Sequence, residues 1–412
     1  MARTTSRLHV PRPPARPGER PDFSYLKLSP AGAVARPETS ASLDEIAPLS
    51  GQLIRVLDDD HRAVGPWNPR LEAEDLQVGL RFMVLTRLFD DRMQRIQRQG
   101  KISFYIKSAG EEAVSVAGAM ALRPDDMLFP SYRNQGLYMA RGRSLVDLMC
   151  QCLSNTRDMC KGRQMPVMYH WASGNIFSIS GNLGTQFPQA VGWAMAAALK
   201  GEDRLAASWI GDGASAEADF HHAVTFAAVY QAPVILNIVN NQWAISSFQG
   251  VAGGEHATFA ARGPGYGIAG LRVDGNDFLA VYAATQWAAE RARRGDGPTL
   301  IEHVTYRAAA HSTSDDPARY RPKEESLAWP LGDPIKRLQA HLTCLGEWSD
   351  ERQQVLEKEL DAHVLASWKE SVQYGTMSEG PRLDPSTMFE DVFKEMPPHL
   401  ARQRRELKSN GS

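Results

Sequence analysis

The amino-acid sequence predicts an α/β fold with a mostly parallel sheet, because short β-rich apolar runs alternate with stretches of helical spacing. Two such runs, residues 204–210 and 233–239, enclose a helix-compatible stretch at 215–231. A further strand is expected at 299–306, after a helix at 277–294. Strand–helix–strand units of this length form right-handed crossovers, so their strands end at the same edge of the sheet. Side chains that follow the strands are therefore expected to meet there.

The remaining predicted elements surround this sheet. A long helix is expected at residues 72–100, and its apolar stripe consists of Leu76, Leu80, Met83, Leu88 and Phe89. Shorter elements are expected as helices at 110–122, 144–153 and 191–200 and as a strand at 271–273. Helices dominate after about residue 330, where Ser349-Asp350-Glu351 combines a hydroxyl cap with acidic residues.

Three regions are predicted along the chain. Residues 1–70 form an N-terminal arm, because the first 40 are rich in Pro, Arg and Ala and offer little to bury. Residues 71–330 form the α/β domain. Residues 331–412 form a C-terminal helical region that contacts a partner subunit.

Composition removes several classes of function. The 412 residues carry a net charge of −2, which gives no reason to expect nucleic acid or an anionic membrane as a partner. The longest nearly apolar stretch, 190–199, is about half the length of a membrane span. The N-terminus lacks the apolar core of a secretory signal, and its prolines disfavour a transit-peptide helix. The cytoplasm is therefore the expected location.

Cysteine usage points away from a disulfide framework. Four cysteines are too few for one in a chain of this size. Cys150, Cys152 and Cys160 also lack the paired spacing of a zinc site. Buried thiols are the expected state of these three residues.

The motif that carries chemistry is Gly211-Asp212-Gly213 after one predicted strand, followed by Asn240-Asn241 after the next. Because both strands end at the same edge, Asp212 and Asn241 are expected to lie close together. Their carboxylate and amide oxygens are hard ligands suited to Mg²⁺, which also takes phosphate oxygens. The glycines let the backbone approach a diphosphate at a helix N-terminus. The motif therefore predicts a site for a magnesium diphosphate.

Two other interpretations of this motif compete. Residues 211–216 also satisfy Gly-x-Gly-x-x-Ala, the dinucleotide fingerprint, but that fingerprint requires an acidic residue where this chain has Asn240-Asn241. The other interpretation is a turn without function. Gly295-Asp296-Gly297 provides an example, because it lies between a helix end and a strand with no following helix and no asparagine pair.

The motif and its strand–helix–strand context resemble the thiamine-diphosphate enzymes. Further segments follow the order found in the α subunits of 2-oxo acid dehydrogenase E1 components, and these are residues 104–105, 110–112, 131–133, 161–166 and 311–316. The Ser-Thr-Ser-Asp-Asp sequence after His311 and the tail segments 388–392 and 396–397 resemble the branched-chain type, and residues 21–26 resemble its bacterial members. The resemblance implies a thiamine-diphosphate-binding three-layer fold with an N-terminal arm and C-terminal helices.

The resemblance also implies roles for individual residues. Asp212 and Asn241 would bind Mg²⁺, with the Trp243 carbonyl as a third protein ligand. The residues that would contact thiamine diphosphate are Tyr132, Arg133, Gly181, Leu183, Gly211, Asp212, Gly213, Ala214, Asn241 and His311. A loop that binds potassium in some relatives matches Ser180, Asn182, Thr185 and Gln186, although a simple turn with helix caps is an equal alternative. Tyr132 as a core aromatic and Arg133 as a surface ion pair are the corresponding alternatives in the phosphate contacts.

His311 is the predicted catalytic residue. It stands in a loop just after a strand end, and an imidazole exchanges protons near neutral pH and can stabilise charge on a reacting group. Without the family loop around it, a satisfied or solvated histidine would be the better interpretation. His221 and His222 lack such a context and are expected to be structural or interface residues. Val239 stands where relatives often carry a phosphate-binding arginine, and Gly181-Asn182 stands where some carry Ser-Pro.

The implied function is that of a branched-chain 2-oxo acid dehydrogenase E1 α subunit. Such a subunit takes part in decarboxylating 2-oxo acids such as 3-methyl-2-oxobutanoate and passing the acyl group to the lipoyl group of an E2 partner. Only one cofactor-type unit is visible, so an E1 β subunit is expected to complete the site in an α₂β₂ assembly. The alternatives are an E1 α subunit for pyruvate or acetoin, or a non-catalytic regulatory subunit. The presence of Asp212, Asn241 and His311 argues against the last.

Overall fold

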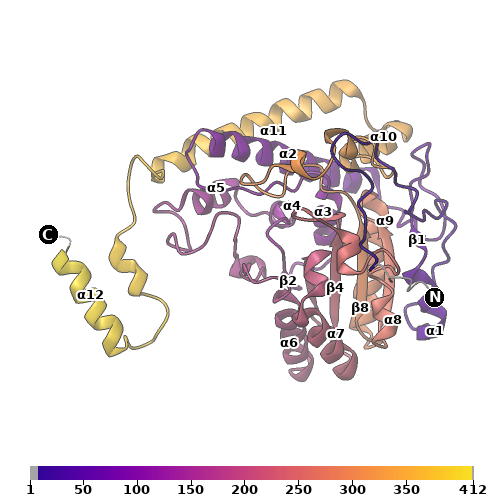
Figure 1. Ribbon diagram of the computed structural model, residues 1–412, viewed down its shortest axis with the longest axis horizontal. Helices are drawn as coiled ribbons and strands as arrows, with labels where there is room; N and C mark the ends of the chain where they lie inside the picture. The colour runs from indigo at the N-terminus through magenta and orange to yellow at the C-terminus, as the bar shows by residue number, and fades with distance from the viewer. Residues whose placement is uncertain (1–7, 411–412) are drawn as a thin grey trace, which may run out of the picture.

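A six-stranded parallel sheet lies at the centre of the computed structural model, which describes residues 8–410 (Figure 1). The strand order is β1-β7-β8-β4-β3-β2, and every neighbouring pair is parallel. The strands are β1 (Leu53–Ile54), β2 (Met127–Phe129), β3 (Ala206–Gly211), β4 (Val234–Asn240), β7 (Ala269–Asp274) and β8 (Thr299–Val304). The predicted α/β class and parallel sheet are confirmed.

The pairing register sets which residues leave the sheet together. Gly211 in β3 is opposite Val239 in β4, and Asn240 in β4 is opposite Val304 in β8. Residues 212, 241 and 305 therefore emerge side by side at the carboxyl edge. A short antiparallel hairpin, β5 (Trp243–Ala244) and β6 (Ser247–Phe248), follows β4 at this edge.

Helices cover both faces of the sheet and give three layers. On one face, Phe187 and Val191 of α6 and Phe220 and Val224 of α7 pack against strand residues such as Ile210. On the other face, helices α2, α3 and α9 pack against alternate strand residues, which are Ala207, Trp209, Ile235, Val239, Leu271, Val273 and Ile301. Alternate residues of each strand thus enter different cores, and this is why the central strands are mostly apolar and are buried along nearly their whole length.

The helices agree with the predicted ones at their centres and differ at their ends. Their bounds are α1 (Leu43–Ile46), α2 (Ala73–Arg98), α3 (Glu112–Met120), α4 (Gln135–Ala140), α5 (Leu145–Leu153), α6 (Gln186–Leu199), α7 (Ala218–Tyr230), α8 (Arg262–Gly265), α9 (Phe278–Arg293), α10 (Pro334–Cys344), α11 (Asp350–Ser371) and α12 (Pro398–Asn410). Short 3₁₀ turns join them, among them Gly213–Ala216 before α7 and Gln249–Ala252 after β6. Ser349 caps α11 as predicted, because its side chain accepts a hydrogen bond from the Arg352 amide.

The N-terminal arm lies against the carboxyl edge of the sheet. The ring of Phe23 meets Trp329 edge-on with centroids 5.3 Å apart, and it also contacts Tyr306. The Tyr25 hydroxyl donates a hydrogen bond to Gln242 Oε1 at 2.9 Å. Further along, residues 53–54 add strand β1 to the edge of the sheet.

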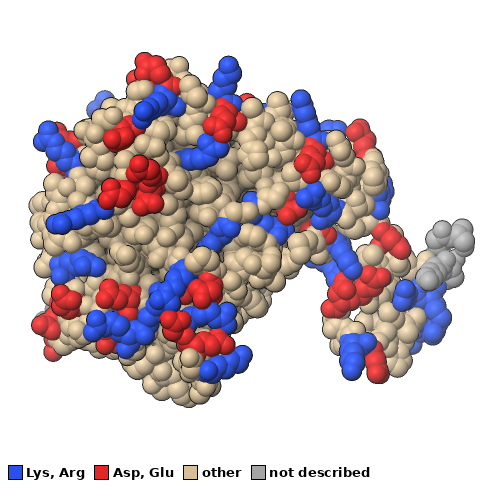
Figure 2. Space-filling view, turned by 180° about the vertical axis from the view of Figure 1, so that it is seen from behind, with Lys and Arg blue, Asp and Glu red and all other residues tan. Residues whose placement is uncertain are grey.

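The C-terminal region has two parts. Helices α10 and α11 pack on α2 and share its core through Leu338, Leu342 and Leu360. The segment beyond α11 stands away from the body and ends in α12 (Figures 1 and 2). Lys161 Nζ fixes it through Asp391, at 2.7 Å, and Glu390, at 3.0 Å.

The visible surface has mixed charge. Lys and Arg lie among Asp and Glu over the face shown in Figure 2. Within residues 8–410, no helix combines the length and the apolar character needed to span a membrane.

Candidate active site

A cavity of about 430 Å³ opens at the carboxyl edge of the sheet. It collects residues from seven stretches of the chain, so the fold brings together side chains that are far apart in sequence. The predicted site residues that line it are Tyr132, Arg133, Gly181, Leu183, Gln186, Gly211, Asp212, Gly213, Ala214, Asn241, Trp243 and His311. Of the remaining predicted residues, Ser180, Asn182 and Thr185 lie in the adjoining loop without lining it.

Asp212 follows β3 and presents a buried carboxylate. Its Oδ1 atom accepts a hydrogen bond from the Gly213 amide at 2.7 Å. Its Oδ2 atom is buried with no hydrogen-bond partner, a costly arrangement for a carboxylate unless a ligand completes it. Burial raises the pKa of this carboxyl to about 6. A free, desolvated oxygen of this kind fits a divalent cation.

Asn241 lies beside it after β4. Its Nδ2 atom donates to Glu111 Oε1 at 2.7 Å, and its Oδ1 atom accepts from the Trp243 amide at 3.2 Å. This pairing orients the amide so that its oxygen stays on the Trp243 side. The Trp243 carbonyl, the third predicted ligand, accepts from Arg307 Nη1 at 2.8 Å. A carbonyl has two lone pairs, so this bond leaves one for a cation.

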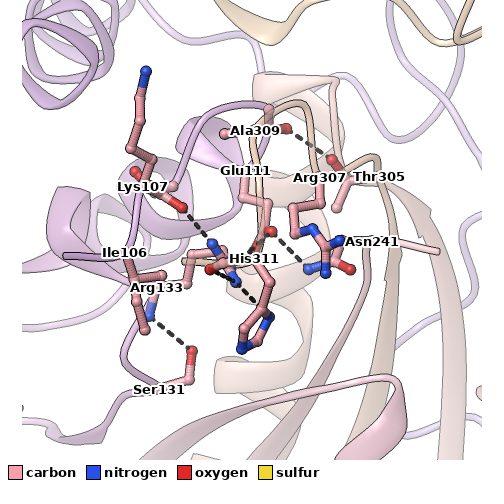
Figure 3. Close-up of polar contacts among 12 residues, drawn as sticks. Ile106, Lys107, Glu111, Ser131, Arg133, Asn241, Thr305, Arg307, Ala309 and His311 are labelled. Carbon is pink, nitrogen blue, oxygen red and sulfur yellow. Dashed lines mark hydrogen bonds and ion pairs between the residues drawn. The ribbon is translucent and has the colours of Figure 1, made fainter. Parts of the chain in front are cut away.

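Arg133 and Glu111 form a buried ion pair next to these ligands (Figure 3). Arg133 Nε lies 3.4 Å from Glu111 Oε1, and both side chains are almost fully buried. Arg133 Nη1 also donates to the Lys107 carbonyl. Burial raises the pKa of Glu111 to about 7, while Arg133 opposes this shift. Arg133 is therefore neither free nor on the surface, because Glu111, Lys107 and His311 fix the position of its guanidinium.

His311 lies against Arg133. Arg133 Nη2 is 3.3 Å from His311 Nδ1 and donates to the His311 carbonyl at 3.1 Å. An arginine can only donate, so Nδ1 is the acceptor and the neutral ring carries its proton on Nε2. The edge of the Tyr132 ring system meets the imidazole, with centroids 5.9 Å apart.

The pKa of His311 is far below that of an ordinary histidine. Burial, followed by repulsion from Arg133 and Arg307, lowers the pKa of its imidazole to about 3. Proton exchange near neutral pH requires an ordinary imidazole pKa. This ring is instead buried near two cations, Arg133 and Arg307. His311 is neutral at pH 7 and is a hydrogen-bond donor through Nε2.

Arg307 is a site residue that the sequence did not indicate. It follows β8 and donates to the carbonyls of Trp243 and Ile245, each at 2.8 Å, and to the Tyr320 hydroxyl at 2.6 Å. These bonds fix the hairpin that forms one wall of the cavity. Its position after a strand end, like that of Asp212 and Asn241, is the signal that could have revealed it. Glu111 belongs to the family-like segment 110–112, but the sequence alone indicates no role for it.

The loop at residues 180–186 has the features of a turn that begins a helix. The Asn182 amide donates to Ser180 Oγ at 3.1 Å, and Thr185 Oγ1 donates to the Asn182 carbonyl at 3.0 Å. Gln186 Oε1 is buried without a partner. The hydroxyl groups are thus engaged in the turn before α6, and potassium binding stays a prediction.

Two predicted non-site histidines lie outside the cavity. His221 and His222 are exposed on α7, and His221 contacts the Tyr266 hydroxyl. Val239 is buried and lines the cavity as an apolar residue.

The sequence matches the family described as "Dehydrogenase E1 component" over residues 80–378. The chain belongs to this family. Residues 4–43 also match the family described as "2-oxoisovalerate dehydrogenase E1 alpha subunit N terminal". Membership favours the thiamine-diphosphate interpretation of residues 211–216 over the dinucleotide one, and it confirms the predicted resemblance.

Named relatives align over nearly the whole chain. The 2-oxoisovalerate dehydrogenase subunit alpha of Pseudomonas aeruginosa is 59% identical over 401 residues, which are 97% of this chain and 98% of the relative. The mitochondrial 2-oxoisovalerate dehydrogenase subunit alpha of Homo sapiens is 38% identical and covers 98% of this chain and 89% of its own length. The corresponding subunit of Bos taurus is 39% identical over 98% of this chain and 88% of its own.

Proposed function

We propose that this chain is the α subunit of a branched-chain 2-oxo acid dehydrogenase E1 component. In that role it takes part in decarboxylating acids such as 3-methyl-2-oxobutanoate and in acylating the lipoyl group of an E2 partner. The observation that carries this proposal is the buried, unpartnered Asp212 Oδ2 beside Asn241 at the mouth of the parallel sheet. The names of the relatives, which align over nearly the whole chain, support the oxo-acid class of substrate.

The residues of the cavity fit thiamine diphosphate and Mg²⁺. Asp212, Asn241 and the Trp243 carbonyl offer the hard oxygen ligands that the metal prefers. Arg133 supplies a buried cation for the diphosphate. A Cβ atom added to Gly181 or Gly211 would meet no atom within 4 Å, so both glycines border open space. Thiamine diphosphate held by these residues would supply an electron sink for the electron pair that stays on the substrate carbon when carbon dioxide leaves.

The chain's own residues then do three kinds of work. Glu111 holds Arg133 and Asn241 together, so the phosphate-binding and metal-binding groups keep a fixed separation. His311 offers its Nε2 proton to an oxygen of the reacting acid, because Arg133 occupies the other ring nitrogen. Arg307 holds the hairpin wall.

The apolar wall favours a branched aliphatic substrate. It consists of Phe104, Ile106, Met165, Met168, Leu183 and Ile245. Such a surface excludes water. Each extra methyl group that a substrate buries against it strengthens binding by about 1–3 kcal/mol. With both subunits present, we expect 3-methyl-2-oxobutanoate to be used with a kcat/KM at least ~10-fold above that for pyruvate. A preference for pyruvate or acetoin would contradict the branched-chain assignment.

An E1 β subunit is proposed to close the cavity in an α₂β₂ assembly. Three residues that line it are half exposed: Met165 at 54%, Leu183 at 50% and Ile245 at 54%. Exposed apolar side chains around an active site are typical of a surface that a partner covers. The purified α chain should therefore be inactive and should gain oxo-acid decarboxylation when β is added. Full activity of the α chain alone would contradict this.

The cytoplasm is proposed as the location, and potassium in the 180–186 loop remains a subsidiary proposal.

A thiamine-diphosphate titration of the assembled enzyme separates an active subunit from a non-catalytic regulatory one. We expect saturable, Mg²⁺-dependent binding.

A further inference from the structure

Three metal-ligating side chains meet on the surface, outside the cavity. His9 Nε2 lies 2.9 Å from Glu255 Oε2, and the rings of His9 and His256 are 5.5 Å apart. One ligand atom from each of the three residues lies within 4.8 Å of the others. Since His9 and Glu255 are 246 positions apart, the fold creates this group and local sequence does not.

The donor set is that of a transition-metal dication. Two imidazole nitrogens and one carboxylate oxygen are common protein ligands of Zn²⁺, with water in the fourth position. Ligand atoms around tetrahedral zinc lie about 3.4 Å apart, given bonds of about 2.1 Å. The three side chains are exposed, so small rotamer changes bring their atoms to that spacing. Imidazole ligands also distinguish this group from the all-oxygen magnesium site proposed in the cavity.

The three side chains come from two segments that are far apart in sequence. His9 belongs to the N-terminal arm, and Glu255 and His256 belong to the loop that follows the 3₁₀ turn Gln249–Ala252. Between His9 and Tyr25 the arm contacts this region again: a Cβ atom on Gly250 would lie 2.9 Å from Pro11 Cβ. Tyr25 then packs on Phe248 of the β5–β6 hairpin, with centroids 5.6 Å apart.

We propose that His9, Glu255 and His256 bind one Zn²⁺-class cation that clasps the N-terminal arm to the 253–259 loop. The bridge crosslinks the arm to the segment that continues into the cavity wall. Without metal, an exposed ion pair between His9 and Glu255 adds little and is screened by salt. Metal occupancy thus decides how firmly the arm is held at His9, beyond the contact of Pro11 with Gly250.

The first test measures metal alone. The α and β chains, assembled and saturated with thiamine diphosphate and Mg²⁺, are titrated with Zn²⁺ against a chromogenic chelator. Wild type should bind one more equivalent per α chain than His256→Ala or His9→Ala, and Glu255→Gln should weaken that site by at least ~10-fold. His222→Ala, which removes an exposed histidine on α7, should keep the full stoichiometry. Equal stoichiometry in wild type and His256→Ala would overturn the proposal and leave an ion pair only.

The second test measures the clasp. Tryptic cleavage between Arg7 and Leu8, directly before His9, should slow by at least ~5-fold when Zn²⁺ is added to wild type, because a held arm reaches the protease less often. The rate in His256→Ala should not respond to Zn²⁺, while oxo-acid decarboxylation remains at the wild-type level. Zinc bound without any change in cleavage would contradict the clasp and reduce the group to an adventitious surface site.

Discussion

Two turns of this chain have the same three letters and opposite surroundings. Gly211-Asp212-Gly213 follows β3, whereas Gly295-Asp296-Gly297 precedes β8. In a parallel sheet, the turn after a strand and the turn before a strand lie at opposite ends of the strands. One turn therefore reaches the cavity at the carboxyl ends, and the other does not. Both aspartates have an Oδ2 atom that is buried without a hydrogen bond. Asp296 Oδ2 has a cation beside it, because Arg294 Nε is 3.3 Å away, and its side chain is 26% exposed. Asp212 instead lines the cavity with no such ion pair.

The difference shows that the role of a short motif depends on the end of the parallel strand at which it lies. At the carboxyl edge, helices begin and leave free N–H groups that favour anions. At the amino edge, helices end, and the positive φ angles of Gly295 (78°) and Gly297 (103°) serve only to turn the chain. The same three letters therefore place one aspartate in the cavity and the other in a turn, where it pairs with Arg294.

The largest expected effect compares these two aspartates directly. Asp212→Ala should abolish Mg²⁺-dependent binding of thiamine diphosphate, because the diphosphate charge loses its bridge to the protein. Asp296→Ala should leave binding and oxo-acid turnover within ~2-fold, as is usual for a surface change. Cofactor titration of both assembled variants makes the measurement. Equal losses would show that the wrong turn was assigned to the site.

A second variant separates chemistry from cofactor binding at the carboxyl edge. His311→Ala should lower acylation of a free lipoyl domain by ~10² or more, the scale of a lost hydrogen-bond donor at the reacting centre. Cofactor affinity should stay within a few-fold, because Asp212 and Asn241 supply the metal ligands. His222→Ala is the matched control. Collapse of cofactor binding in His311→Ala would make this histidine structural.

A third variant concerns the support of the ligands. Glu111→Gln keeps an acceptor for Asn241 but leaves the buried Arg133 without its counter-charge. Cofactor affinity should fall ~10-fold, the lower end for changes behind metal ligands. Glu290→Gln, near the Asp296 turn, should have no effect on the same titration. An unchanged Glu111→Gln enzyme would mean that Arg133 is positioned by Lys107 and His311 alone.

The smallest effect concerns a histidine buried within the sheet itself. Burial lowers the pKa of His303 to about 3, and its Nε2 is 2.9 Å from Asn237 Oδ1. The unfolded chain binds this proton below about pH 6.5 while the folded chain does not, so stability is present above that pH and is lost as pH falls towards 3.

Between pH 6.5 and 5.5 this loss amounts to about 1 kcal/mol. His303→Gln should remove that part of the acid sensitivity, which is seen as a smaller drop in Tm between the two pH values than in wild type. The same drop in both proteins would show that the ring takes up a proton without unfolding.

Much of the framework follows from local pattern. Strands β3, β4 and β8 and helix α2 were predictable because each is long enough to show an apolar period. The two-residue β1 and three-residue β2 are too short to show one, and they exist only because a neighbour pairs with them. Helix α6 begins at Gln186, earlier than expected, since Pro188 is tolerated within its first turn.

The site was predictable where strand ends converge. Asp212 and Asn241 follow adjacent strands, so their proximity needed only the crossover rule. The roles of Glu111 and Arg307 depend on contacts between distant segments, and no sequence period reports such contacts. The low pKa of His311 likewise depends on burial and then on two arginines, at positions 133 and 307, and the fold supplies both causes.

The lengths of the strands also bear on self-association. The central strands have six or seven residues, whereas the edge strands β1 and β2 have two and three. A strand edge can recruit another chain only through its unpaired N–H and C=O groups, and short edges offer few of them. The sheet is therefore a poor template for growth by strand addition. Copies of this chain that assemble into larger particles have to meet through side chains on helices and loops.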